Sequence, residues 1–107
     1  MATVELRSYQ DAQGRKPFDA WLDGLRDATA KKRVLQRLTR LEAGLFGDAK
    51  PVGAGVLELR IDYGPGYRVY FGRHGTSLVL LLIGGDKRMQ DADIARAKSY
   101  WNDWKNR

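Results

Sequence analysis

The chain of 107 residues contains no cysteine, a single histidine and three prolines. Without cysteine it can form neither a disulfide nor a zinc site with thiolate ligands. The longest uninterrupted apolar run, at residues 78–83, is far shorter than the roughly 20 residues needed to cross a bilayer as a helix. The first residues also lack the apolar core of a signal peptide. We therefore expect a cytoplasmic protein without a membrane partner.

The composition is that of a small folded domain. Apolar residues make up 43% of the chain and charged residues 30%, which argues against disorder. At this length we expect one domain over residues 1–107. Lys and Arg outnumber Asp and Glu by 19 to 13, giving a formal net charge of +6. This charge favours polyanionic partners: nucleic acid, the ribosome or an acidic protein.

The first half of the chain predicts a short strand and two helices. Val4, Leu6 and Ser8 alternate with Glu5, Arg7 and Tyr9, which predicts a short, half-exposed strand. Pro17 suits the first position of a helix, whose apolar stripe would be Phe18, Trp21, Leu22 and Leu25. Thr29 is a plausible cap for a second helix, with a buried stripe of Val34, Leu35, Leu38, Leu41 and Leu45. We expect the two helices to form a hairpin on one face of a sheet.

The second half predicts three strands and a final helix. Apolar residues alternate in the first two strands, and their apolar faces coincide only if Leu59 pairs with Val69. That register places Arg60 opposite Arg68. A two-residue turn at His74-Gly75 would set Val69 against Leu80. The final helix is expected from Asp91, with a packing stripe of Ile94, Ala97, Trp101 and Trp104. The resulting fold class is α+β, with a small, twisted, mainly antiparallel sheet, the helical hairpin on one face and a C-terminal helix.

The opposed arginines are the first candidate site. Like charges facing each other across two strands cost up to about 1 kcal/mol, unless an anion lies between Arg60 and Arg68. Guanidinium groups can grip a phosphate through paired hydrogen bonds. The alternative is an ordinary solvated face on which Glu58 and Asp62 neutralise the two arginines diagonally.

A second candidate is the segment GGDKRMQD at residues 84–91, interpreted as a loop from a central strand to a helix N-terminus. Free backbone N–H groups and the helix dipole favour an anion there, and Lys87 and Arg88 add charge. A glycine-containing turn of this kind usually has a structural role alone. The predicted proximity of Arg68 favours an anion site.

The second helix carries a third candidate. Arg33, Arg37 and Arg40 fall on the side opposite its buried stripe. They form either a solvated helix face or a surface that docks RNA through its backbone. No carboxylate pair, Ser/His/Asp set or metal-ligand spacing stands out in the chain. We therefore expect no metal and no cofactor.

Four stretches of the sequence, VLELRI, GPGYRVYF, LLIGGDKRMQ and DIARA, occur in an order that resembles the RelE/ParE superfamily of bacterial toxins. The HigB-like and related phage addiction module killer proteins are the most similar branch. The resemblance covers nearly the whole chain. It implies a twisted sheet packed on a helical hairpin, with the opposite face binding messenger RNA on the ribosome.

The resemblance also implies an activity and site residues. Such a toxin is a metal-independent endoribonuclease in which the RNA 2′-hydroxyl attacks the adjacent phosphate while basic side chains stabilise the developing charge. Arg68 matches a phosphate-stabilising arginine, and Lys87 and Arg88 fall where a further functional basic residue lies; Arg60 joins them as a catalytic candidate. The expected RNA contacts are Arg33, Arg37, Arg40, Tyr70 and Gln90. The expected partners are the ribosome, its mRNA and a cognate helix-turn-helix antitoxin.

One position departs from the RelE pattern. Where RelE has a tyrosine that acts as general base, early in the final helix, this chain has Ile94. Tyr67, Tyr70 or Lys87 would have to compensate, although Tyr67 lies on the apolar side of the predicted register. The alternative is a ParE-like toxin that binds and inhibits DNA gyrase without cleaving RNA.

Overall fold

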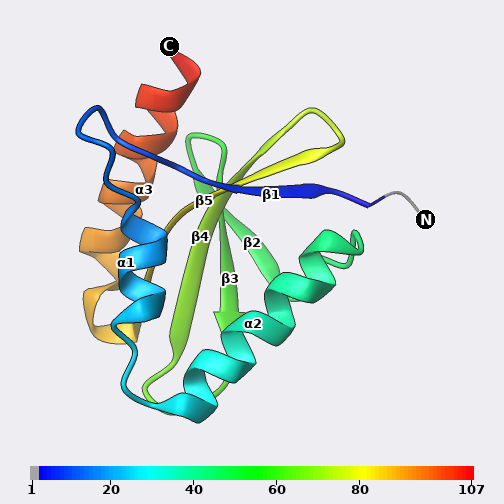
Figure 1. Cartoon of the computed structure of the whole chain (residues 1–107), viewed down its shortest axis with the longest axis vertical. Coiled ribbons are helices and arrows are strands. Elements are labelled where there is room, and N and C mark those ends of the chain that lie inside the picture. The colour runs from blue at the N-terminus through cyan, green and yellow to red at the C-terminus, as the bar shows by residue number, and fades with distance from the viewer. Residues whose placement is uncertain (1–2) are drawn as a thin grey trace.

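The computed structural model describes residues 3–107 and shows an α+β fold built on one five-stranded sheet (Figure 1). Along the chain the elements are β1 (Glu5–Ser8), α1 (Pro17–Asp23), α2 (Ala28–Glu42), β2 (Ala49–Gly53), β3 (Val56–Ile61), β4 (Tyr67–His74), β5 (Leu78–Asp86), the 3₁₀ turn η1 (Lys87–Met89) and α3 (Gln90–Lys105). The strand order is β1-β5-β4-β3-β2. The β1–β5 pair is parallel and the other pairs are antiparallel. The predicted class, sheet type and C-terminal helix are confirmed.

Helices cover both faces of this sheet. Under α1 and α2, a first cluster includes Phe18, Val34, Leu38, Leu41, Leu59, Val69 and Phe71. Under α3, a second cluster includes Val56, Tyr70, Leu80, Leu82, Ala97 and Trp101. The inner strand β5 is therefore buried on both sides, which explains the unbroken apolar run at residues 78–83.

The two N-terminal helices contribute to the same cluster but have different principal partners. α1 packs along β5, whereas α2 contacts β1 and β3. Figure 1 shows them over different parts of the sheet. A paired helical hairpin is not confirmed.

The start and the stripe of α2 differ from the prediction in two details. Its cap is Asp27, whose carboxylate accepts hydrogen bonds from the backbone N–H groups of Thr29 and Ala30 at 2.9 and 3.2 Å. The prediction of Thr29 as cap was therefore wrong. Leu35, predicted in the buried stripe, is 46% exposed, because one residue along a helix rotates the side chain by about 100° from Val34. Leu45, which is 49% exposed, lies beyond the end of the helix.

The β3–β4 register matches the prediction. Leu59 pairs with Val69 and Arg60 with Arg68, because alternating apolar residues leave one register that buries both apolar sets.

The predicted β4–β5 register was wrong. The loop contains residues 75–77 instead of a two-residue turn, so that His74 pairs with Leu78. Gly75 begins this loop with a φ of 62°, a conformation that glycine adopts without steric cost. A further register shift beside Tyr70 sets Val69 against Gly84 and Arg68 against Gly85.

The two glycines belong to β5 and not to a loop, which corrects the interpretation of residues 84–91. A Cβ on Gly84 would overlap the ring of Trp21 on one face of the sheet. A Cβ on Gly85 would overlap the carboxylate of Asp93 on the other face. These glycines are needed for close packing. The connection to α3 is the short turn η1, and the helix begins at Gln90 rather than at the predicted Asp91.

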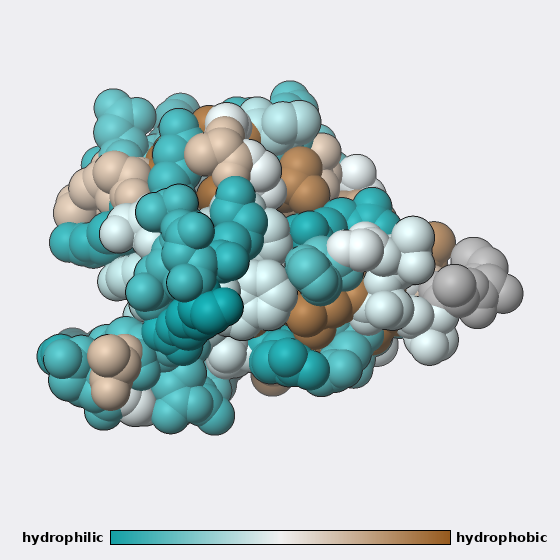
Figure 2. All heavy atoms as spheres, turned by 90° about the horizontal axis from the view of Figure 1, so that it is seen from above, coloured by the Kyte–Doolittle hydropathy of each residue, from teal (hydrophilic) through white to brown (hydrophobic). Residues whose placement is uncertain are grey.

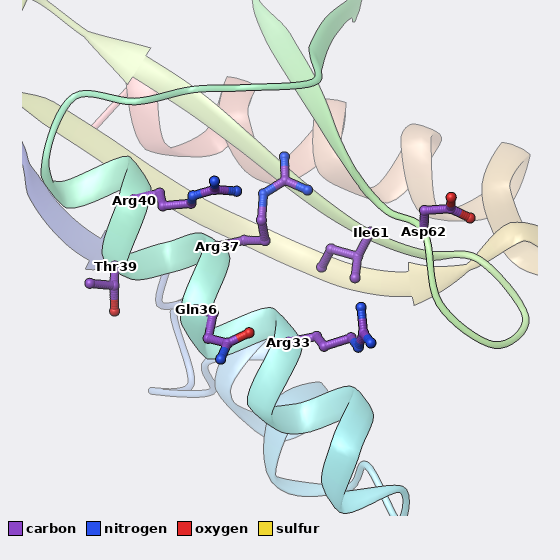
Figure 3. Close-up of a pocket in the computed structure, with 7 residues that line it drawn as sticks. All are labelled: Arg33, Gln36, Arg37, Thr39, Arg40, Ile61 and Asp62. Atoms are coloured by element: carbon purple, nitrogen blue, oxygen red, sulfur yellow. The ribbon is translucent and has the colours of Figure 1, made fainter.

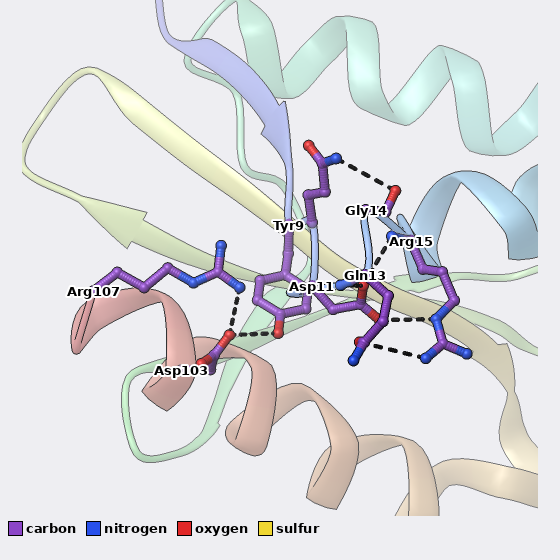
Figure 4. Close-up of polar contacts among 8 residues, drawn as sticks. Tyr9, Asp11, Gln13, Gly14, Arg15, Asp103 and Arg107 are labelled. Carbon is purple, nitrogen blue, oxygen red and sulfur yellow. Dashed lines mark hydrogen bonds and ion pairs between the residues drawn. The ribbon is translucent and has the colours of Figure 1, made fainter.

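The C-terminal end of α3 is tied to the segment after β1 (Figure 4). Asp103 accepts hydrogen bonds from the Tyr9 hydroxyl at 2.7 Å and from Arg107 at 2.6 Å. The Tyr9 ring also stacks on Tyr100, with 4.8 Å between centroids. Burial and the bond to Asp103 raise the pKa of Tyr9 to about 12. This contact closes the fold across 94 residues of sequence.

The surface is predominantly polar on the face in Figure 2. Hydrophilic residues cover most of it, and hydrophobic residues appear as separate small patches. Within residues 3–107, no helix combines the length and apolar character needed to cross a membrane.

Candidate functional site: two basic hollows at the end of β3

A buried carboxylate organises the face of the sheet next to the start of α3. Glu58 is 1% exposed. Its Oε1 accepts a hydrogen bond from Arg60 Nε at 3.0 Å, and its Oε2 accepts from the Tyr70 hydroxyl at 3.0 Å and from Gln90 Nε2 at 2.8 Å. Burial acts to raise the pKa of Glu58, but these hydrogen bonds and the charge of Arg68 outweigh it, so the pKa lies below its usual value. The carboxylate therefore stays ionised.

Arg68 is held in the same cluster without a hydrogen bond from its Nε. This nitrogen lies 3.8 Å from Glu58 Oε2, close enough for charge attraction but too far for a hydrogen bond. Arg68 is 8% exposed, and its Nε is buried without a hydrogen-bond partner within residues 3–107. A buried unpaired donor costs about 1–3 kcal/mol. Such groups call for a functional explanation.

The arginine pair lines a hollow of about 430 Å³, which we call the β3 hollow. Its wall contains Asp48, Arg60, Ile61, Asp62, Gly64, Pro65, Gly66, Arg68 and Lys87. Three predicted site residues, Arg60, Arg68 and Lys87, thus meet in one place although they come from separate elements. The hollow also holds two exposed carboxylates, those of Asp48 and Asp62.

Arg88 is directed to a local partner. Its Nη2 pairs with Asp86 Oδ2 at 3.2 Å, and its backbone N–H donates to Asp86 Oδ1 at 2.9 Å. The backbone N–H of Arg88, which was predicted to be free for an external anion, is therefore already bonded to the Asp86 carboxylate. Arg88 does not line the β3 hollow.

Tyr70 and Gln90 have internal roles. Tyr70 was predicted to contact RNA, but it is fully buried and donates to Glu58. Direct contact with RNA is therefore excluded by burial. Gln90 is half-buried and donates to the same oxygen.

A second hollow, of about 610 Å³, lies between α2 and the end of β3, and we call it the α2 hollow (Figure 3). Its wall contains Arg33, Gln36, Arg37, Thr39, Arg40, Ile61 and Asp62. All three predicted α2 arginines line it, opposite a single carboxylate. Arg33 also lies over the ring of Tyr63, with 4.8 Å from its guanidinium carbon to the centroid.

The two hollows are neighbours. Both include Ile61 and Asp62 in their walls. Arg37 Nη1 donates to the backbone carbonyl of Arg60 at 2.9 Å, which fixes α2 against β3. The basic residues predicted from two separate patterns therefore surround one end of one strand.

The structure restricts the choice of a general base. Burial and the bond to Glu58 raise the pKa of Tyr70, and burial followed by the charges of Asp27 and Asp86 raises the pKa of Tyr67. Both tyrosines are therefore poor proton acceptors at neutral pH. Asp48 and Asp62 are exposed carboxylates in the wall of the β3 hollow. No sequence pattern singles out either one as a base.

A second buried carboxylate was also missed. Asp93 in α3 is 3% exposed and receives one long bond, from Arg96 Nη1 at 3.4 Å. Burial is the main cause that raises its pKa; the charge of Arg96 opposes this and that of Asp86 adds to it. Its position four residues before Ala97, in the predicted packing stripe, could have indicated the inner side of the helix. Within residues 3–107, no group of three His, Cys, Asp or Glu side chains could hold a metal ion.

Among known proteins, one from Haemophilus influenzae is similar to this chain. It is 52% identical over 81 residues, which cover 76% of this chain and 82% of the relative. The chain belongs to the same family as that protein. The relative is named only as an uncharacterized protein, so family membership assigns no activity. No family model and no solved structure matches the chain.

Proposed function

We propose that this protein is the toxin of a type II toxin–antitoxin system, with a RelE-like fold, and that it cleaves messenger RNA on the ribosome. The fold proposal includes the helical hairpin of that superfamily. Support comes from the HigB-like order of the sequence stretches and from the small, mainly antiparallel sheet with α1 and α2 on one face.

The observation that carries the proposal is the meeting of Arg60, Arg68 and Lys87 in the β3 hollow. Arg68 contributes a nearly buried guanidinium whose Nε has no hydrogen-bond partner within residues 3–107. Arg68 also lines the hollow, and a guanidinium can donate paired hydrogen bonds to phosphate oxygens. Fixed positive groups beside a reacting phosphate stabilise the charge of the pentavalent transition state.

The proposed reaction balances with the RNA, water and side chains in the wall of the β3 hollow. The 2′-oxygen forms a bond to the adjacent phosphorus while the bond from phosphorus to the 5′-oxygen breaks. The products are a 2′,3′-cyclic phosphate and a 5′-hydroxyl. The 2′-hydroxyl proton passes to a base, for which Asp62 is placed in the wall of the hollow, and the 5′-oxygen takes a proton from water or Lys87.

The α2 hollow extends the site. The α2 hollow adjoins the β3 hollow at Ile61 and Asp62. An RNA chain whose scissile phosphate lies at Arg68 can therefore continue past Arg33, Arg37 and Arg40. These arginines would bind the backbone and add affinity without reading the sequence.

A second candidate function is inhibition of DNA gyrase by binding, as in ParE-like toxins. The specific observation in its favour is the position of the candidate tyrosine bases. Tyr70 is buried, Tyr67 is half-buried with a raised pKa, and Ile94 stands where RelE has its tyrosine. A toxin that acts only by binding needs no base.

Both candidates require a cognate antitoxin, which in this branch is a small helix-turn-helix protein. We expect it to bind the basic surface through acidic or apolar contacts. Co-expression should abolish toxicity and yield a stable complex. A purified pair that does not associate at low salt would contradict the type II assignment.

The test of the proposed function is to map mRNA ends transcriptome-wide after brief induction of the protein, beside the Arg68→Ala variant. We expect new 5′-hydroxyl ends within translated regions for the wild type and none for the variant. Growth arrest without such ends, accompanied by loss of gyrase supercoiling in extracts, would replace the nuclease with the gyrase-binding function.

A further inference from the structure

We propose that Gln90 and Tyr70 keep Arg68 available for an anionic ligand by occupying the carboxylate oxygen that Arg68 would otherwise bind. The inference rests on the proposed function, because it takes the β3 hollow as the site of an RNA phosphate. Gln90 and Tyr70 are then positioning residues, which act on the ligand through Glu58 and Arg68.

The contacts at Glu58 Oε2 carry this inference. A carboxylate oxygen has two lone pairs. The Tyr70 hydroxyl donates to Oε2 at 3.0 Å and Gln90 Nε2 at 2.8 Å. Both lone pairs are therefore in use, and Arg68 Nε remains 3.8 Å from the same oxygen.

The other oxygen of Glu58 is also engaged. Arg60 Nε donates to Oε1 at 3.0 Å. Arg60 thus satisfies its Nε within the protein, whereas Arg68 Nε has no partner within residues 3–107. Two arginines that face each other across β3 and β4 are therefore not equivalent. The Nε of Arg60 is anchored to Glu58, whereas the Nε of Arg68 stays unbonded within the described residues.

The competition has a direct consequence for anion binding. A guanidinium that is hydrogen-bonded to a carboxylate has fewer donors and less net charge to offer a second anion. If Gln90 released Oε2, a small movement would let Arg68 Nε bond to Glu58. The affinity of the hollow for phosphate would then fall, although every charged residue would still be present.

Both competing donors come from fixed elements. Tyr70 is fully buried within β4. Gln90 is the first residue of α3, immediately after the η1 turn, which Asp86 closes by accepting from the Arg88 backbone N–H. Groups on rigid elements hold a site in its binding geometry. The turn between β5 and α3 is thus connected to Arg68 through Gln90 and Glu58.

The experiment measures binding of a 2′-deoxy trinucleotide, which offers phosphodiesters but lacks the attacking hydroxyl. The proteins are the wild type, Gln90→Ala, Glu58→Gln and the double variant, with Arg68→Ala as the variant that removes the phosphate site. The matched control is Gln13→Ala, because Gln13 is an exposed glutamine that lies far from Gln90 in the sequence. Thermal unfolding of each variant reports its stability separately.

We expect Gln90→Ala to weaken trinucleotide binding at least about 5-fold when Glu58 is present, a coupling within the range for residues in one network. In the Glu58→Gln background the same change should have less than about a 2-fold effect, because no carboxylate remains to capture Arg68. Glu58→Gln alone should strengthen binding. Gln13→Ala should leave it unchanged.

A merely structural role for Gln90 gives a different pattern. The loss of binding would then be equal with and without Glu58, and would follow the loss of thermal stability. That result would overturn the inference while leaving the proposed site intact, provided that Arg68→Ala abolishes binding. Trinucleotide binding that does not depend on Arg68 would instead remove the proposed phosphate site and this inference with it.

A second measurement does not depend on the folding of the Glu58→Gln variant. The side-chain Nε–H resonance of Arg68 can be followed by NMR in the wild type and in Gln90→Ala. We expect it to move downfield in Gln90→Ala, as a hydrogen bond to Glu58 forms, and to show slower exchange with water. An unchanged resonance would contradict the competition for Oε2.

Discussion

The ring of Trp21 lies directly on the backbone of Gly84, so closely that the strand could not carry a side chain at this position. Trp21 belongs to the cluster that joins α1 to the sheet. The contact therefore fixes α1 over β5, the strand that ends beside the η1 turn and Lys87. Packing on one face of the sheet thus supports the site on the other.

This contact predicts a non-additive pair of substitutions. Gly84→Ala should cost about 1–3 kcal/mol by overpacking, and Trp21→Ala about 3 kcal/mol, the lower end for a large aromatic because the ring is half-exposed. In the Trp21→Ala background the cost of Gly84→Ala should fall below about 1 kcal/mol. Chemical denaturation of the four proteins measures the coupling. Strictly additive costs would mean that the two residues do not restrict each other.

Asp93 predicts a pH dependence. Burial raises the pKa of its carboxyl above the unfolded value, so the stability that it contributes is fully present below the unfolded pKa and is lost as pH rises through the folded pKa. Asn stays neutral at every pH. Relative to wild type, the free energy of unfolding of Asp93→Asn should therefore be higher near pH 7.5 than below about pH 3.9, the unfolded pKa of Asp, where the wild-type carboxyl is protonated as well.

Thermal unfolding of wild type and Asp93→Asn across this range tests the sign. The comparison isolates Asp93, because Glu58 and the other carboxylates titrate in both proteins. A stability difference that does not change with pH would show that Asp93 has an ordinary pKa in the folded state.

The α2 hollow predicts a salt-dependent contribution to RNA binding. Arg40→Ala should weaken binding of a single-stranded RNA and lower the slope of log affinity against log salt by about 0.7, the value for one neutralised phosphate on a single strand. Arg15→Ala is the control, since Arg15 is an exposed arginine that is paired with Asp11 at 3.2 Å and lines neither hollow. Equal effects of the two changes would mean that only net charge matters.

Parts of the fold and site follow from local patterns. The alternation in β3 and β4 specifies their register, because a slip of one residue would expose an apolar face. That register alone brings Arg60 opposite Arg68. The helical spacing of Arg33, Arg37 and Arg40 likewise placed them together.

Other parts depend on three-dimensional contacts that no local pattern contains. Gly84 and Gly85 were interpreted as loop residues because glycine normally marks turns. Their role depends on packing against Trp21, far away in sequence, and against Asp93 in the following helix. The register shift beside Tyr70 changed the β4–β5 pairing. It could not be predicted, because a strand that is apolar on both faces has no alternation from which a bulge can be located. One of the two interpretations of the sequence made Glu58 a counterion on a solvated face. Its burial, and its hydrogen bond from Gln90 at the start of α3, became visible only in the structure.

The most direct test of the account is single-turnover cleavage of mRNA on programmed ribosomes by purified wild type, Arg68→Ala and Arg68→Lys, with unchanged thermal unfolding confirmed for each. We predict a loss of at least about 100-fold for Arg68→Ala, the scale of losing one preorganised donor at a transition state. Arg68→Lys should recover only part of the activity, because an ammonium cannot reproduce the two-donor guanidinium fork. Full cleavage activity in Arg68→Ala would contradict the assignment of the β3 hollow as the phosphate site.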